Sequence, residues 1–155
     1  MNTVYLGLGS NLGDREALLL ESIQEIKKQI GTVSLQSAFY VTEPWGFQSE
    51  HPFLNAVVCC ETSLTPLQVL DCTQHIEKQL GRTHKSVNRQ YSDRPIDIDL
   101  LLFNDLILNT PRLTLPHPLM HQRRFVLEPL AEIASQLVHP VLKQTIAELL
   151  QQQAH

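Results

Sequence analysis

The chain has 155 residues and a mass of 17.6 kDa, and 43% of its residues are hydrophobic while 18% are charged. This composition is too apolar for a disordered chain and too interrupted by polar residues for a membrane protein. Its 12 Lys and Arg residues against 16 Asp and Glu residues give a net charge of -4, which argues against a dedicated nucleic-acid-binding protein.

The cysteines and the N-terminal residues indicate the cellular compartment. Cys59, Cys60 and Cys72 are odd in number and form no C-x-x-C pattern, so we interpret them as small buried apolar residues in a reducing compartment. Residues 1–9 lack the basic start of a signal peptide and the length of a transmembrane helix. We therefore expect a cytoplasmic location and no membrane partner.

The first predicted elements are a strand, a helix and a second strand. Residues 3–8 are rich in strand-forming side chains and end at a turn signal. Apolar residues at spacings of four and three then predict a helix, with Asp14 as its N-terminal cap and Gly31 as its stop. Alternating apolar and polar residues predict a half-buried strand over residues 33–41, with Ser37 as the exception.

The following residues repeat this order with longer loops. A second helix is predicted to begin at Thr65-Pro66, where a cap hydroxyl precedes a proline, and to end at Gly81. Strands are predicted at residues 53–62 and 96–103, each preceded by a polar loop, at residues 42–52 and 82–95.

The order β-α-β-β-α-β predicts an α+β fold, a ferredoxin-like antiparallel sheet with helices on one face. A short strand at residues 106–109 could pair back as a hairpin, and helices interrupted at Pro129 and Pro140 are expected from His117 onward. No repeat or linker divides the chain, so we expect one domain over residues 1–155.

Asp97 and Asp99 are the clearest candidate for chemistry. Two residues apart on a strand, they share one face with Cα atoms about 6.6–7 Å apart, while Ile96 and Ile98 face the core. Paired carboxylates of this kind suit Mg²⁺, which binds through one or two carboxylates plus substrate phosphates. The competing interpretation is an edge strand with a solvated acidic face.

Cations gather in the sequence around this carboxylate pair. Seven of the twelve Lys and Arg residues fall between residues 82 and 124, namely Arg82, Lys85, Arg89, Arg94, Arg112, Arg123 and Arg124. The planar donor group of arginine matches phosphate oxygens, so the pattern favours a metal-bridged polyanion over a loop of solvated charges. His117 and His121, four residues apart, could be metal ligands on one helix face, but Pro118 lies between them and no third soft ligand is nearby. A phosphate contact or simple burial is therefore favoured for both.

Aromatic side chains form the third candidate feature. Trp45 lies in the loop at residues 42–52, where a flat ring suits stacking on a planar heterocycle. Phe53 and Phe125 could stack in the same way or fill the core. Asn55 shares a strand face with Phe53 and offers both a donor and an acceptor.

Taken together, these residues resemble the hydroxymethyldihydropterin pyrophosphokinase family of folate biosynthesis. The segments that carry the resemblance are Gly9-Ser-Asn11, Thr42-Glu-Pro-Trp-Gly46, Phe53-Leu-Asn55, Arg94-Pro-Ile-Asp-Ile-Asp99, Pro116-His117 and Arg123-Arg-Phe125. The resemblance implies transfer of pyrophosphate from ATP to the hydroxymethyl oxygen of the reduced pterin, with release of AMP. It also implies a ferredoxin-like α+β fold and small-molecule partners only.

The resemblance further implies a role for individual residues. Asp97 and Asp99 would hold two Mg²⁺ ions, and Arg82 and Arg94 would be catalytic. The implied ATP-binding residues are Leu70, Gln74, Glu77, His84, Ile98, Arg112, His117 and Arg123. The implied pterin-binding residues are Gly9, Thr42, Pro44, Trp45, Phe53, Asn55 and Phe125.

Two other functions compete with this one. A two-metal phosphodiesterase or nuclease would use the same carboxylates but needs a broad basic groove, which the net charge of -4 disfavours. A non-catalytic module could instead bind Mg-ATP without turnover. We expect a monomer or weak dimer and no nucleic-acid partner.

Overall fold

The computed structural model describes residues 1–42, 52–83 and 95–153, without the side chains of residues 82 and 83. The strands are β1 (Asn2–Ser10), β2 (Thr32–Gln36), β3 (Tyr40–Thr42), β4 (Phe53–Thr62), β5 (Asp97–Phe103), β6 (Leu108–Asn109) and β7 (Thr114–Leu115). The helices are α1 (Arg15–Gln29), α2 (Pro66–Thr83), α3 (Arg124–Ala134) and α4 (Ile146–Gln152), with a 3-10 turn η1 at Met120–Gln122.

The main sheet is antiparallel and has β1 near its centre. The strand order is β2-β4-β1-β5, and β3 pairs with β4 beyond the end of β2. Gly9 of β1 lies opposite Asn55 of β4 on one side and opposite Asp97 of β5 on the other. Candidate pterin and metal residues therefore lie in one row across the sheet.

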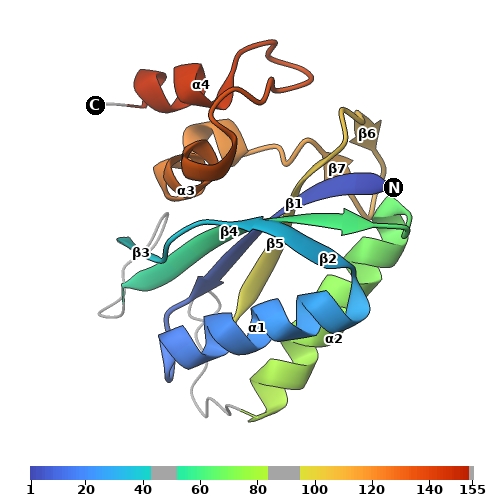
Figure 1. The fold of residues 1–155 in the computed structure, drawn as a ribbon, viewed down its shortest axis with the longest axis vertical. Coiled ribbons are helices and arrows are strands. Elements are labelled where there is room, and N and C mark those ends of the chain that lie inside the picture. Colours follow the sequence, from blue (N-terminus) through green and yellow to red (C-terminus); the bar gives the residue numbers. More distant parts are fainter. Residues whose placement is uncertain (43–51, 84–94, 154–155) are drawn as a thin grey trace.

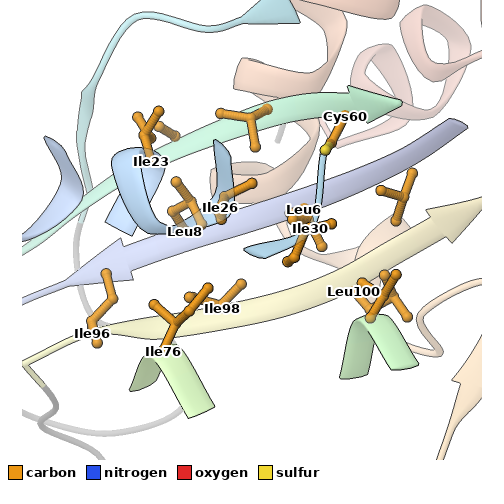
Figure 2. Packing of buried hydrophobic residues seen from close by; sticks show 14 of the residues in the cluster. Leu6, Leu8, Ile23, Ile26, Ile30, Cys60, Ile76, Ile96, Ile98 and Leu100 are labelled. Carbon is orange, nitrogen blue, oxygen red and sulfur yellow. The ribbon is translucent and has the colours of Figure 1, made fainter. Parts of the chain in front are cut away.

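Helices cover both faces of this sheet (Figure 1). α1 and α2 pack on one face over a core of aliphatic side chains (Figure 2). The labelled members of this core are Leu6, Leu8, Ile23, Ile26, Ile30, Cys60, Ile76, Ile96, Ile98 and Leu100. α3 and α4 pack on the opposite face, where Val57, Leu101 and Leu127 belong to a second buried cluster. The predicted α+β fold is confirmed, with the C-terminal helices on the face left open by α1 and α2.

The predicted starts of α1 and α2 are confirmed, and the predicted end of α2 is wrong. Asp14 caps α1 by accepting a hydrogen bond from the Ala17 amide at 3.1 Å, and the Thr65 hydroxyl accepts one from the Gln68 amide at 3.2 Å. α2 continues through Gly81 to Thr83, because a glycine only weakens a helix by about 1 kcal/mol. Within the described ranges, no helix is both long and apolar enough to cross a bilayer.

Gly31 follows the end of α1, but a glycine is needed there for a reason other than the helix stop predicted from the sequence. A left-handed backbone is found at Gly13, with φ of 70°, and not at Gly31. A Cβ atom at Gly31 would instead collide with the backbone carbonyl oxygen of Glu61. The glycine is needed because β4 passes directly beside the chain at this point.

The strand predicted over residues 33–41 is two strands, β2 and β3, separated at residues 37–39. Ser37 is buried there, since its hydroxyl accepts a hydrogen bond from the Val57 amide at 2.9 Å and its own amide donates to the Val57 carbonyl. Leu35 and Val41 are exposed, so apolar alternation gave the wrong face for both. A side chain bonded to the neighbouring strand interrupts β2 without leaving buried polar groups unpaired.

Two C-terminal predictions also change. The hairpin forms between β6 and β7, with Leu108 opposite Leu115, rather than between β6 and β5. Pro129 lies inside α3 and does not interrupt it. The chain does leave regular structure near Pro140, as predicted, before α4 begins at Ile146.

His139, in the connection between α3 and α4, makes the free energy of unfolding of the protein depend on pH. Its buried ring accepts hydrogen bonds at Nδ1 from the amides of Val141 and Leu142, at 3.2 and 3.0 Å. Burial, and then the nearby His121 ring at 6.2 Å, lower the pKa of His139 below its ordinary value of 6.5. The unfolded chain therefore binds this proton first, and stability is lost as pH falls below about 6.5 until the folded pKa is reached.

We expect His139→Asn to flatten this acid dependence, because asparagine keeps an acceptor for both amides and cannot titrate. Its free energy of unfolding, measured by urea denaturation between pH 6.5 and 5, should vary less steeply than that of the wild type, by up to about 1.4 kcal/mol per pH unit. His75→Asn, on the exposed surface of α2, is the matched control. An unchanged slope in His139→Asn would contradict this assignment.

Candidate active site

The Asp97 and Asp99 carboxylates share the α3 face of β5, as the sequence predicted. Ile96 and Ile98 are buried in the core beneath α1 and α2, whereas both aspartates are half-buried. Leu101 continues their alternation and belongs to the cluster under α3 and α4. The two carboxylates are therefore held on a strand with a buried opposite face, which fixes the backbone that carries them.

Arg123 joins this carboxylate pair to an aromatic ring. Its Nη1 lies 3.8 Å from Oδ2 of Asp99, and its guanidinium carbon lies 5.6 Å from the centre of the Phe125 ring. The Arg123 side chain is only 17% exposed, so its charge is poorly screened by water. One cation therefore lies between a candidate metal ligand and a candidate pterin-stacking ring.

The donor set fits magnesium. Asp97 and Asp99 offer oxygen ligands only, and the described residues contain no group of three or more His, Cys, Asp or Glu side chains that could hold a metal. A site with two carboxylates and no soft ligand suits a hard cation whose other positions are filled by water and phosphate oxygens. The residues present therefore match Mg²⁺ and do not match zinc.

His117 lies beside the same cation and is neutral at physiological pH. Burial, followed by the positive charge of Arg123, lowers the pKa of His117 to about 4. Its Nδ1 accepts a hydrogen bond from the Leu119 amide at 3.1 Å, which leaves the proton on Nε2. His117 can thus donate one hydrogen bond to an anion without adding a charge. His121 lies apart from it, beside His139.

Three implied ATP-binding residues lie on α2, which packs beside β5, the last strand of the main sheet. Leu70, Gln74 and Glu77 follow each other at spacings of four and three, which places them on one side of the helix. Glu77 accepts a hydrogen bond at 2.7 Å from the amide of Ile98, at the middle of the carboxylate pair. This contact ties α2 to the strand that carries the candidate metal ligands.

The predicted gathering of cations is only partly correct among the described residues. Arg112 donates to Asp71 of α2 at 2.6 Å, with both side chains more than half exposed. Arg124 points away from the carboxylates to Glu128 and to the Gln153 carbonyl, at 3.0 and 3.3 Å. Arg82 lies in the last turn of α2, and its side chain is outside the description. His84, Lys85, Arg89 and Arg94 lie outside the described residues.

Four of the five described pterin-binding candidates, all except Phe125, meet at the ends of β1, β3 and β4. The Asn55 side-chain amide donates to the Thr42 hydroxyl, and Thr42 lies opposite Phe53 in the β3–β4 ladder. A Cβ atom added to Gly9 would lie 2.8 Å from Oδ1 of Asn55 and 3.4 Å from Cδ1 of Phe53. Both side chains therefore pass directly over Gly9.

Two candidates for this site, Pro44 and Trp45, lie outside the described residues. Phe53 lies over Gly9 and Phe125 lies beside Arg123, so a sandwich of the pterin between the two rings stays a prediction.

Gly9→Ala should weaken pterin binding, because the added methyl group displaces the Asn55 amide from Thr42. Loss of one such hydrogen bond, worth about 1–1.5 kcal/mol, should raise the KM for the pterin about tenfold and leave the KM for ATP unchanged. Gly7→Ala is the matched control, since its Cβ would make an ordinary 3.4 Å contact with Leu101. Equal effects of the two variants would show that Gly9 has no special relation to the pterin site.

Sequence reasoning missed Arg15, which anchors the start of β4. Its Nη1 donates to the backbone carbonyl of Pro52 at 2.8 Å, immediately before Phe53. Arg15 is the first residue of α1, and its local sequence matches any exposed helix start. No local pattern in the sequence could have identified a contact between residues 37 positions apart.

Comparison with known proteins agrees with this geometry. A sequence model of the 7,8-dihydro-6-hydroxymethylpterin-pyrophosphokinase family matches residues 5–135. The chain is 52% identical over 141 residues to the 2-amino-4-hydroxy-6-hydroxymethyldihydropteridine pyrophosphokinase of Porphyromonas gingivalis, covering 90% of this chain and 95% of that one. It is 42% identical over 137 residues to the protein of the same name from Bacillus subtilis, covering 88% and 80% of the two chains.

The fold also matches solved structures. The wild-type HPPK-DHPS of Plasmodium falciparum with pteroate superimposes on 97% of this chain with a TM-score of 0.78 at 19% identity. This chain spans 42% of that longer protein, so the likeness concerns the fold of its matching part. On the match over residues 5–135 and the identity to its relatives, the chain belongs to the 7,8-dihydro-6-hydroxymethylpterin-pyrophosphokinase family.

Proposed function

We propose that this chain transfers the pyrophosphoryl group of Mg-ATP to the hydroxymethyl oxygen of 6-hydroxymethyl-7,8-dihydropterin and releases AMP. The observation that carries the proposal is the position of Arg123 between Asp99 and the Phe125 ring, at 3.8 and 5.6 Å. That arrangement puts a phosphate-binding charge and a surface for a flat heterocycle next to each other. The name of the family to which the chain belongs gives a hydroxymethylpterin and pyrophosphoryl transfer.

The reaction forms one bond and breaks one bond at the β-phosphorus. The hydroxymethyl oxygen attacks the β-phosphorus of ATP, and the bond from that phosphorus to the oxygen bridging the α- and β-phosphates breaks. AMP leaves with the bridging oxygen, and the hydroxyl proton is lost to water. Phosphoryl chemistry of this kind needs alignment and charge neutralisation rather than a covalent intermediate on the protein.

In this proposal Asp97 and Asp99 would hold two Mg²⁺ ions, which supply charge neutralisation for the phosphates when bound. Arg82, Arg94 and Arg123 would pair with phosphate oxygens, where an arginine fork makes paired hydrogen bonds. His117 would donate a hydrogen bond from Nε2–H to a phosphate oxygen while staying neutral, in keeping with its lowered pKa of about 4.

The remaining implied residues would bind the two substrates. For ATP these are Leu70, Gln74, Glu77, His84, Ile98 and Arg112. Arg112 would have to exchange its exposed ion pair with Asp71 for the nucleotide, and such exposed pairs contribute less than about 1 kcal/mol. For the pterin they are Gly9, Thr42, Pro44, Trp45, Phe53, Asn55 and Phe125.

We further propose that residues 1–155 act as one domain, as a monomer or weak dimer, with these two small molecules as partners and no nucleic acid. A cytoplasmic location is part of the proposal, because ATP is the co-substrate and the three cysteines are free.

Product analysis tests the proposal. The purified protein is incubated with Mg-ATP, with and without the pterin alcohol, and nucleotides are separated by chromatography. We expect AMP and the pterin diphosphate to appear together, and only when the pterin is present. ADP as the product would indicate an ordinary kinase. Cleavage of added single-stranded DNA would indicate a phosphodiesterase, and the absence of any turnover would indicate a binding module.

A further inference from the structure

Glu132, on the last turns of α3, makes a cluster of hydrogen bonds outside the residues considered so far. Its two carboxylate oxygens each accept from the Ala38 amide at 3.1 Å, and Oε1 also accepts from the Tyr40 hydroxyl at 2.6 Å. Ala38 and Tyr40 are 94 and 92 positions away in the sequence. These contacts tie α3 to the segment that enters β3.

The segment held by Glu132 is only partly paired to the sheet, although Phe39 within it packs against the core beneath α1 and α2. β3 has three residues, and among the described strands it pairs with β4. Ser37 bonds to Val57 of β4 through its amide and its hydroxyl, and β-ladder pairing resumes at Tyr40 opposite Asn55. The Ala38 amide between these two points donates to Glu132 instead of to the sheet.

The two elements joined by Glu132 carry opposite parts of the pterin site. β3 ends at Thr42, which accepts the hydrogen bond from Asn55. α3 presents Phe125 seven residues before Glu132, which is about two helical turns and places both side chains on nearly the same face. The same face of α3 thus carries Phe125 near its start and Glu132, which bonds to β3, near its end, about 10 Å apart along the helix.

We propose that Glu132 is a positioning residue that sets the distance between the Thr42 side and the Phe125 side of the pterin site. It acts through Ala38 and Tyr40 and does not touch the substrate. This inference rests on the proposed function, which assigns Thr42 and Phe125 to pterin binding. It adds that pterin affinity depends on a carboxylate outside the binding residues.

The test compares variants of α3 in steady-state kinetics. We expect Glu132→Ala to raise the KM for the pterin about five- to tenfold, with kcat and the KM for ATP within about twofold of wild type, because the loss falls on one binding site. Glu128→Ala is the matched control, since Glu128 lies on the same face one turn earlier and bonds to Arg124 instead of β3. Its pterin KM should stay at the wild-type value, and its Tyr40 titration should move less than in Glu132→Ala, because Glu128 acts on Tyr40 only through its charge.

Rescue and spectroscopy separate positioning from a general structural role. Glu132→Gln can still accept from the Ala38 amide and donate to the Tyr40 oxygen, so we expect its pterin KM within about twofold of wild type. The bond to Glu132, followed by burial and by the charges of Glu132 and Glu128, raises the pKa of Tyr40 to about 12. Glu132→Ala removes the largest of these causes, so it should move one phenol titration, followed by ultraviolet absorbance, part of the way toward 10. The variant Tyr40→Phe lacks this phenol, so the titration that disappears from its absorbance curve is the one that belongs to Tyr40.

The outcomes distinguish this inference from the proposed function. A wild-type protein that forms no AMP with the pterin overturns the proposed function, whatever the tyrosine titration shows. An active wild type in which Glu132→Ala and Glu128→Ala have equal pterin KM values overturns the role of Glu132 alone. A pterin KM in Glu132→Gln as high as that in Glu132→Ala would likewise contradict a role that consists of hydrogen bonds to Ala38 and Tyr40.

Discussion

Asp97→Asn and Asp99→Asn should each reduce kcat by about 10²–10³-fold while the protein stays folded. Each change keeps the shape of the side chain and removes one of the charges that would hold magnesium against ATP. The metal supplies several kcal/mol of charge stabilisation in such reactions, and about 1.4 kcal/mol corresponds to a factor of ten in rate. Both carboxylates are half-buried and lie on the α3 face of β5, so their loss should leave the core beneath α1 and α2 intact.

The measurement is kcat at saturating ATP and pterin as a function of magnesium concentration, with thermal unfolding as the check on folding. Glu61→Gln is the matched control. Glu61 is also a carboxylate on the sheet, but it lies near the far end of β4 and accepts hydrogen bonds from the Thr3 hydroxyl. Near-normal rates in either aspartate variant would contradict the metal assignment.

Arg123→Ala should lower kcat/KM for ATP by about 10²-fold. The guanidinium lies 3.8 Å from Asp99 and is largely shielded from water, so its removal leaves the carboxylates without their nearest described cation. It also removes a partner for phosphate oxygens whose charge changes in the transition state. Arg123→Lys should restore only part of the activity, because an ammonium group cannot make the paired hydrogen bonds of a guanidinium.

Arg124→Ala is the control for this experiment, since the neighbouring arginine bonds to Glu128 and the Gln153 carbonyl instead. We expect it to retain wild-type kcat/KM. If Arg123→Ala and Arg124→Ala lost activity equally, the effect would come from α3 as a whole and not from the contact with Asp99.

Local sequence patterns were sufficient for β5 and for the start of α1. The alternation at Asp97 and Asp99 correctly placed the carboxylates opposite a buried face, and the Asp14 cap correctly placed the start of α1. These predictions succeeded because periodicity and capping depend on neighbouring residues only.

Several incorrect predictions failed because of contacts between distant residues. Ser37 interrupts the predicted strand because it bonds to Val57, and Gly31 is required because Glu61 passes beside it. Arg124 looked equivalent to Arg123 in the sequence, yet it donates to the Gln153 carbonyl while Arg123 lies beside Asp99. Glu132 has the pattern of an exposed helix residue, and its bonds to Ala38 and Tyr40 exist only in the folded chain.

The most direct test of the central claim is a crystal structure with Mn²⁺ in place of Mg²⁺, a non-hydrolysable ATP analogue and the pterin alcohol. Anomalous scattering then locates the metal without reference to the protein atoms. We predict two peaks within coordination distance of the Asp97 and Asp99 oxygens, about 2.0–2.3 Å, which also touch phosphate oxygens of the analogue. Bound nucleotide with no metal peak at either aspartate would contradict the account.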